Sequence, residues 1–350
     1  MEPVPYFLGV MFLKLTISQI AKLAGVSKST VSRALNGSEY VSEKTKRRIL
    51  EIIRKYDYVP DSKAVSLSKK KTFTVGLVLP STSGPFYGEV IRGVEEVLSA
   101  KKYFTLLTIL DSGQDVKQAR KRYLSMIREK RVDGAIVFDP TVDKTTVHKL
   151  SESKIPIVFL LKDFQDFGID SVMVDNLSGS ARMVDHLVEV HGYKRIAFVK
   201  GPEVSDDSEQ RFQGFVESLK RHNLCCDDLL VFNSDFTFEG GRKVFQELRK
   251  KLNKLEAIFC ANDEMALGII EEMKKEGIQI GKDIAVVGFD DAFWSAYIDP
   301  PLTTVHQPMY EVGKISAQRV LERINNPDVF KDPVKIMLQT QLVVRKSCGC

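Results

Sequence analysis

The chain has 350 residues, of which 43% are hydrophobic and 28% charged, and this composition is typical of a globular protein with two or three domains. No apolar run reaches the roughly 18 residues that a membrane-spanning helix needs, which excludes that class of protein. The net charge of +5 is uneven, because residues 1–72 contain 14 Lys and Arg against 6 Asp and Glu, and the remainder contains 37 against 40. A basic front on a slightly acidic body favours a nucleic-acid partner, and a merely solvated basic surface is the alternative.

The first segment, MEPVPYFLGVMFLKL, is apolar but has no basic residue before Lys14 and no small-residue cleavage site. It is therefore a poor secretory signal, and we expect a cytoplasmic, nucleoid-associated protein. Residues 1–12 are interpreted as a disordered or non-native tail, with Met11 as the alternative start of the chain.

Three short helices are predicted next. A one-sided apolar stripe over 17–24 predicts the first, and Gly25 can adopt the left-handed conformation that ends it. Ser27 is a good N-cap for a second helix over 28–36. A third helix is expected to open at Ser42, with one face formed by Ile49, Ile52, Ile53 and Tyr56. Two helices joined by a glycine turn and braced by a third predict a helix-turn-helix headpiece over 13–60.

The predicted second helix, VSKSTVSRALNG, combines a narrow apolar stripe with a dense polar face, which suits a recognition helix in a DNA major groove. Lys28 and Ser29 are expected to read base edges, and Arg33, one turn later, to bind a guanine or a phosphate. The other polar side chains are expected to bind the DNA backbone. The predicted DNA-binding residues of the headpiece are Thr16, Ser18, Ser27, Lys28, Ser29, Thr30, Ser32, Arg33, Asn36 and Tyr40. An ordinary helical hairpin is the structural alternative.

After Thr72, short apolar runs alternate with amphipathic stretches, and this alternation predicts parallel sheets built from βαβ units. A body of this length favours two lobes, which we place at about 73–173 plus 303–333 and about 174–302 plus 334–346. Ligands in such folds bind beyond the carboxyl ends of the strands. Several runs end there in polar residues, namely Asp111, Asp139, Asp175-Asn176, Asn262-Asp263 and Asp290-Asp291.

The segment TISQIAKLAGVSKSTVSRALNG resembles the headpiece of the lactose-repressor (LacI)/GalR-type family of bacterial transcriptional regulators. The segments VDGAIVF, GYKRIAFVKGP, RFQGF, IAVVGFDD and PPLTTVHQP resemble the effector-binding domain of the same family, which has the fold of periplasmic sugar-binding proteins. The resemblance covers about 15–346 and implies a helix-turn-helix headpiece, a hinge helix and linker over 61–72, and a two-lobed α/β body. It also implies that Leu67 is the hinge-helix leucine that enters the minor groove of the operator, although a plain linker is the alternative.

The resemblance further implies that Arg211 grips the effector, that Asn262 and Asp290 add polar contacts, and that Phe86 packs on the ligand. Trp294, the only tryptophan, is a further candidate for an aromatic platform. Carboxylate, amide and guanidinium groups beside aromatic rings suit a sugar, and a purine or another small metabolite is the alternative effector. The acidic and amide residues could instead cap helices. The segment KDFQDFGIDS departs from the family pattern, and Phe164, Asp166 and Phe167 are expected to reshape the wall of the ligand pocket.

The expected protein is a homodimeric repressor that binds a palindromic double-stranded DNA operator and is switched by a small-molecule effector, with a population shift between lobe orientations as the mechanism. No leucine-heptad tail follows the body, so a dimer is the minimal assembly. A transport-type sugar-binding protein is the competing hypothesis. An enzyme is disfavoured because we find no phosphate loop, nucleophile elbow or clustered metal ligands. The terminal pair Cys348 and Cys350 lacks a second ligand pair at zinc-like spacing, so these cysteines are interpreted as incidental thiols and no metal or cofactor is expected. A redox role for this pair is the alternative.

Overall fold

The computed structural model describes residues 15–35, 40–58, 71–110, 115–227 and 230–350. These residues form two compact units, one ending at Lys71 and the other running from Thr72 to Cys350. We call the first unit the headpiece and the second the body. No described helix is long and apolar enough to cross a membrane.

The headpiece contains the three predicted helices, α1 (Ile17–Ala24), α2 (Lys28–Leu35) and α3 (Glu43–Lys55). Ile20, Val31 and Ile49, one from each helix, are fully buried in their common core. The second helix ends at Leu35 within the described residues, and Asn36 lies outside them. Of the residues expected on one face of the third helix, Ile49 is fully buried, whereas Tyr56 is the C-cap, because α3 ends at Lys55, and has 43% of its surface exposed.

Local sequence explains the turn between α1 and α2. Thr16 and Gln19 form a reciprocal capping box at the start of α1. Gly25 ends that helix with φ of 63°, and its N–H bonds back to the carbonyls of Ala21 and Lys22. Ser27 then caps α2, because its Oγ accepts the Thr30 N–H at 3.1 Å. The predicted glycine turn and N-cap are both confirmed.

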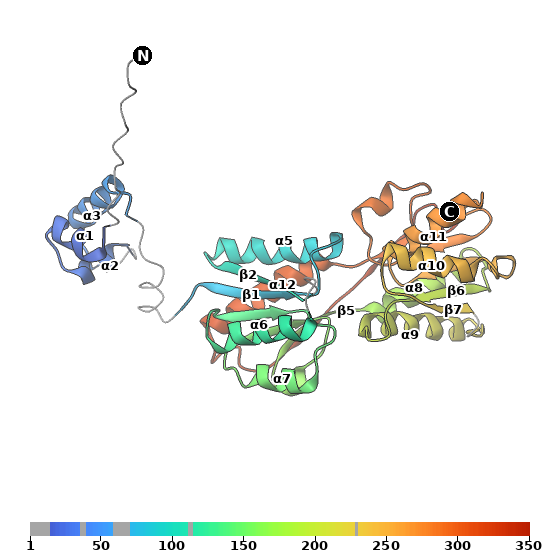
Figure 1. The fold of residues 1–350 in the computed structure, drawn as a ribbon, viewed down its shortest axis with the longest axis horizontal. Coiled ribbons are helices and arrows are strands. Elements are labelled where there is room, and N and C mark those ends of the chain that lie inside the picture. The colour runs from blue at the N-terminus through green and yellow to red at the C-terminus, as the bar shows by residue number, and fades with distance from the viewer. Residues whose placement is uncertain (1–14, 36–39, 59–70, 111–114, 228–229) are drawn as a thin grey trace, which may run out of the picture. The chain divides into compact units, whose positions relative to one another are not determined.

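The larger lobe of the body is a six-stranded parallel sheet in the order β11-β5-β4-β3-β1-β2. Its strands are β1 (Thr74–Leu79), β2 (Phe104–Ile109), β3 (Gly134–Val137), β4 (Ile157–Leu160), β5 (Asp170–Val174) and β11 (Lys335–Leu338). Helices α5 (Pro85–Ala100) and α12 (Met309–Asn325) cover one face, and α6 (Val116–Arg128) and α7 (Lys144–Ser151) the other (Figure 1). Alternate strand residues supply the two cores: Leu77 and Leu79 face α5, whereas Val78 faces α6.

The smaller lobe is a four-stranded parallel sheet in the order β7-β6-β8-β9, built from β6 (Ile196–Lys200), β7 (Val231–Asn233), β8 (Ala257–Cys260) and β9 (Ala285–Val287). Helix α8 (Asn176–Glu189) pairs with α9 (Asp206–Arg221), and α10 (Phe238–Leu248) pairs with α11 (Asp263–Lys275). In Figure 1, α10 and α11 lie on one face of this sheet and α9 on the other. Short helical turns η1 (Gln165–Phe167), η3 (Leu252–Lys254) and η4 (Phe293–Ala296) complete the body.

Three segments of the described chain connect the lobes, at Asp175, at 307–308 and at 339–340. Strand β10 (Thr304–His306) pairs with β12 (Gln341–Val343), and Thr303, directly before β10, bridges to Val287 of β9, so both strands belong to the smaller lobe. Strand β11, in contrast, pairs with β5 in the larger sheet. The lobe limits expected at 303 and 334 are therefore corrected: residues 303–306 lie with the smaller lobe, and 335–338 with the larger.

Candidate functional sites

The polar face of α2 forms the candidate DNA-binding surface of the headpiece. Lys28, Ser29 and Arg33 are exposed on it, whereas Val31 and Ala34 on the opposite face are buried. The Ser27 hydroxyl lies 2.7 Å from that of Ser29 and forms the cap, so these hydroxyls gather at the N-terminus of the helix. Such a helix start favours a phosphate oxygen, because its N–H groups and dipole attract negative charge.

The other predicted DNA-binding residues of the described chain differ in exposure. Thr16 is exposed at the start of α1, Ser18 is half-buried, and Tyr40 is 91% exposed. Thr30 and Ser32 are half-buried on α2. Asn36 and Leu67, the residue assigned to the hinge helix, lie outside the described residues.

Arg211, on α9, is the centre of a polar network at the carboxyl edge of the smaller sheet. Only 3% of its surface is exposed. Its Nε donates to Asn176 Oδ1 at 2.8 Å, and its Nη1 donates to the Ala261 carbonyl at 2.6 Å and to Asp290 Oδ1 at 3.3 Å. The guanidinium also stacks on Phe289, 4.0 Å from the ring centroid. This cation is therefore fixed in position before any ligand arrives.

Asp290 connects that network to a segment that joins the lobes. Its Oδ1 accepts a hydrogen bond from Gln307 Nε2 at 2.6 Å, in the connection between β10 and α12. Burial raises the pKa of Asp290 to about 7, although Arg211 opposes the shift. Gln307 Oε1 is buried and has no hydrogen-bond partner among the described residues, which leaves one acceptor for a ligand donor.

The larger lobe contributes aromatic side chains from the start of α5. Phe86, as predicted there, is half-buried and packs edge-on against Tyr87 at 5.1 Å. The pKa of Tyr87 is raised to about 12, mainly by burial and to a smaller extent by the nearby carboxylates of Asp290, Asp207 and Glu264. Tyr87 therefore faces acidic groups of the smaller lobe and keeps its proton, so its hydroxyl can donate a hydrogen bond.

Asn262 has a clear structural role. Its Oδ1 accepts the Met265 N–H at 3.0 Å as the N-cap of α11, and its Nδ2 donates to the Phe236 carbonyl at 2.9 Å. The neighbouring Asp263 is fully buried and binds Thr304, Ser295 and the Ala292 N–H. The capping alternative therefore describes the local structure, and the effector contact of Asn262 stays a prediction.

Two further expectations differ from the structure. Asp139, one of the polar residues expected at the strand ends where ligands bind, is fully buried and forms a 2.8 Å ion pair with Arg120 on α6. Phe164 and Phe167 pack with Phe159 in the core beside α7, because η1 turns the chain back toward that face, so they do not form a pocket wall. From the same segment, Lys162 instead forms a 3.2 Å ion pair with Asp206 of the smaller lobe.

Trp294 is half-buried in η4, and its side chain forms no hydrogen bond or ring contact with the other described residues. The residues missed at the site are Asp207, Tyr87 and Gln307, together with the ring of Phe289. Asn176 had a sequence signal, since it follows a strand at the ligand edge. Gln307 lies in the PPLTTVHQP segment, but no contact could be assigned to it from the sequence, because its partner Asp290 is 17 residues away in another segment.

Comparison with known proteins agrees with this architecture. Residues 16–61 match the profile described as "Bacterial regulatory proteins, lacI family", and residues 184–348 match the "Periplasmic binding protein-like domain". A curated relative, the probable HTH-type transcriptional repressor ExuR of Bacillus subtilis (strain 168), is 33% identical over 337 residues, which cover 95% of this chain and 98% of that protein.

Two solved structures cover nearly the whole chain. The complex of the transcriptional regulator CelR with cellobiose is 30% identical, has a TM-score of 0.71, and covers 95% of this chain and 99% of its own. The Lac repressor dimer bound to operator and the anti-inducer ONPF is 26% identical with a TM-score of 0.82, over 96% and 99%. The helix-turn-helix headpiece and the periplasmic-binding-protein-like body predicted from the sequence are thus confirmed. The chain belongs to the LacI family of bacterial regulatory proteins.

Proposed function

We propose that this protein is a cytoplasmic transcriptional repressor that binds a palindromic operator as a homodimer and is switched by a small sugar. Several relatives, among them ExuR of Bacillus subtilis, are transcriptional repressors, which supports a regulatory role. The observation that carries the proposal is the link from Arg211 through Asp290 to Gln307, because it joins a polar site to a connection between the lobes.

The chemistry of the polar site favours a sugar. A sugar hydroxyl donates one hydrogen bond and accepts others, and Asp290, Arg211 and the unpaired Gln307 Oε1 offer both kinds of partner. The half-buried rings of Phe86 and Tyr87 suit the apolar face of a pyranose. A solved relative binds cellobiose, which agrees with this choice. A purine is the second candidate, since the same groups can bind a base edge.

The switch is proposed to act through lobe orientation. A ligand that engages Asp290 competes with Gln307 for the same carboxylate, so it changes the contacts of the 307–308 connection. The resulting shift between lobe orientations would alter DNA affinity by a coupling free energy of about 1–3 kcal/mol. Leu67 would deliver that change to the minor groove from the hinge segment, as the family resemblance implies.

The effector is tested by titrating the purified protein with mono- and disaccharides and then purines, following Trp294 fluorescence and the thermal midpoint. We expect one sugar to give a saturable response that Arg211→Ala abolishes. Arg221→Ala serves as the control, because Arg221 lies on the same helix, is 59% exposed and should leave the response intact. A response to purines alone would replace the sugar with the second candidate.

DNA binding is tested by fluorescence anisotropy with a palindromic duplex and a single half-site duplex at several salt concentrations. The logarithm of the affinity should fall linearly with the logarithm of salt concentration. Lys28→Ala should lower the DNA affinity. Lys101→Ala, at an exposed lysine of the body, serves as the control and should leave the DNA affinity unchanged. Equal affinity for the full palindrome and the half-site would contradict the dimer.

A further inference from the structure

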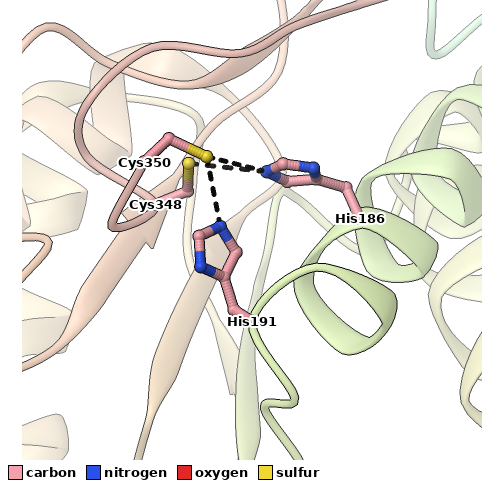
Figure 2. A group of neighbouring side chains, drawn as sticks. All are labelled: His186, His191, Cys348 and Cys350. Atoms are coloured by element: carbon pink, nitrogen blue, oxygen red, sulfur yellow. Dashed lines mark hydrogen bonds between the residues drawn. The ribbon is translucent and has the colours of Figure 1, made fainter.

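Four side chains with metal-binding atoms meet at one end of the smaller lobe. They are His186 on α8, His191 just after that helix, and Cys348 and Cys350 at the end of the chain (Figure 2). Their ligand atoms all lie within 4.8 Å of one another. The sequence shows no second pair of metal ligands close to the two cysteines. In the folded chain that pair is supplied by two histidines more than 150 residues earlier.

The spacing of these atoms agrees with tetrahedral coordination. Zinc binds sulfur at about 2.3 Å and histidine nitrogen at about 2.0–2.1 Å, which places a sulfur and a nitrogen ligand about 3.6 Å apart. The Sγ of Cys348 lies 3.5 Å from His186 Nε2, and the Sγ of Cys350 lies 3.4 Å from His191 Nε2. The diagonal distance from Cys350 Sγ to His186 Nε2 is 3.9 Å.

The fold holds the terminal cysteines against α8. Ser347 fastens the segment, because its Oγ donates to the Val286 carbonyl at 2.5 Å and accepts the Thr303 N–H at 2.8 Å. Gly349 has φ of 103°, a conformation that favours glycine and turns the chain so that both neighbouring cysteines face the histidines. The position of the cluster is therefore set by the backbone and not only by side-chain rotamers.

Neighbouring groups also orient the ligands. The Tyr193 ring stacks on His191 with centroids 5.1 Å apart, and its hydroxyl donates to the Cys348 carbonyl at 3.2 Å. Thr303 Oγ1 donates to the Cys348 sulfur at 3.2 Å, which stabilises a thiolate. Metal ligands in proteins are commonly held by such outer contacts.

We propose that His186, His191, Cys348 and Cys350 form a structural zinc site that ties the C-terminal segment to α8. Two thiolates and two imidazoles are a donor set that zinc prefers, and two thiolates neutralise its charge. The four protein ligands fill the coordination sphere, so the site stabilises the lobe and leaves no position for a substrate. The ion cross-links residues 162 apart in sequence, for example His186 and Cys348.

A second group of possible ligands, Asp185 and Glu189 on α8 with His222 at the end of α9, does not support a metal site. The Asp185 carboxylate already accepts hydrogen bonds from Ser218, Arg221 and His222. These partners neutralise it without an ion, so this group supplies a useful control rather than a competing site.

The test begins with protein purified under reducing conditions, dialysed against metal-free buffer and then loaded with zinc. We expect one tightly held zinc per chain and a higher thermal midpoint than in protein stripped with a chelator. Cobalt should replace zinc and give a sulfur-to-cobalt charge-transfer band together with the visible spectrum of tetrahedral cobalt. Cys350→Ser should remove one sulfur ligand and lower zinc affinity by at least about 100-fold, more than outer-shell changes typically do.

Cys350 is exposed, so its substitution should leave the lobe folded even where changes at buried Cys348 do not. Matched controls are Cys225→Ser, an exposed cysteine of the same lobe, and His222→Gln, which should both retain one zinc. Two results would overturn the proposal: no zinc retained by the reduced protein, or unchanged zinc affinity in both Cys350→Ser and His191→Gln. Loss of zinc binding in Cys225→Ser would place the ion at another site and would also overturn the proposal.

Discussion

Replacing Arg211 with Ala tests whether the buried ion pair with Asp290 holds the smaller lobe together. The change removes three hydrogen bonds and the stacking on Phe289, and it leaves the Asp290 carboxylate without its cation. Removing one partner of a buried pair costs about 3–5 kcal/mol. Removing the exposed Arg221, which lies on the same helix as Arg211 and pairs with Asp185, should cost less than about 1 kcal/mol.

The cost of Arg211→Ala should depend on pH. The pKa of Asp290 is about 7, so without the arginine this carboxyl can stay protonated and neutral at mildly acidic pH. The destabilisation should therefore be smaller at about pH 5 than at about pH 8, where the unpaired charge is costly. Adding Asp290→Asn removes that charge. At about pH 8 the double variant should therefore lose about 1–3 kcal/mol less unfolding free energy than the sum of the losses in the two single variants.

The assay is urea unfolding followed by circular dichroism and by Trp294 fluorescence, which reports on the smaller lobe. Coincident transitions would justify a single unfolding free energy. Strict additivity of Arg211→Ala and Asp290→Asn would refute the reasoning, because it would mean that the two groups do not stabilise each other. A cost of Arg211→Ala no larger than that of Arg221→Ala would refute it as well.

Three further predictions follow from single positions. Leu67→Ala should weaken operator binding without changing effector affinity; equal operator affinity for variant and parent would falsify the minor-groove wedge. Gly25→Ala should destabilise the headpiece by about 1–2 kcal/mol in thermal melts, because φ of 63° strains a residue with a Cβ atom even though the nearest atom is 3.9 Å away. Asp290 keeps its proton to about pH 7 in the folded state but only to about pH 4 when unfolded, so its contribution to stability, present below pH 4, should be lost as pH rises to 7. Asp290→Asn should reduce the loss of stability between pH 4 and 7 without removing it, because the pKa of buried Asp263 is also raised, to about 6. A slope of urea midpoint against pH that is the same in the variant and the parent would contradict this contribution of Asp290.

The features that sequence predicted best are those with local causes. The glycine turn at Gly25 and the cap at Ser27 depend on residues at most four positions away, so the sequence contains the whole signal. The longer buried strands and amphipathic helices follow from periodicity over ten or more residues. Strands such as β7 and β10, with three residues each, are too short for any periodic pattern, and pairing with distant strands defines them.

The contacts of the candidate site depend on distant pairs, which explains why the sequence identified Arg211 and Asp290 but not the contacts that hold them in place. The family resemblance suggested the arginine, yet Asn176 and Ala261 approach it from segments 35 and 50 residues away. The cysteine and histidine cluster was missed for the same reason. A CGC ending alone has no partner at short range, and only the packing of the chain end on α8 brings the histidines to it.

Helix α8 explains why the polar site and the proposed zinc site should be separable. Helices in such lobes run opposite to the parallel strands, so the N-terminus of α8 lies at the carboxyl edge of the sheet, where Asn176 binds Arg211. His186 lies ten residues further on, about 15 Å along the helix axis. Stripping zinc should consequently lower the melting temperature while the Arg211-dependent effector response keeps its affinity in the protein that stays folded. A large loss of effector affinity on chelation, below the melting transition, would show that the end of α8 positions Asn176 and would contradict their independence.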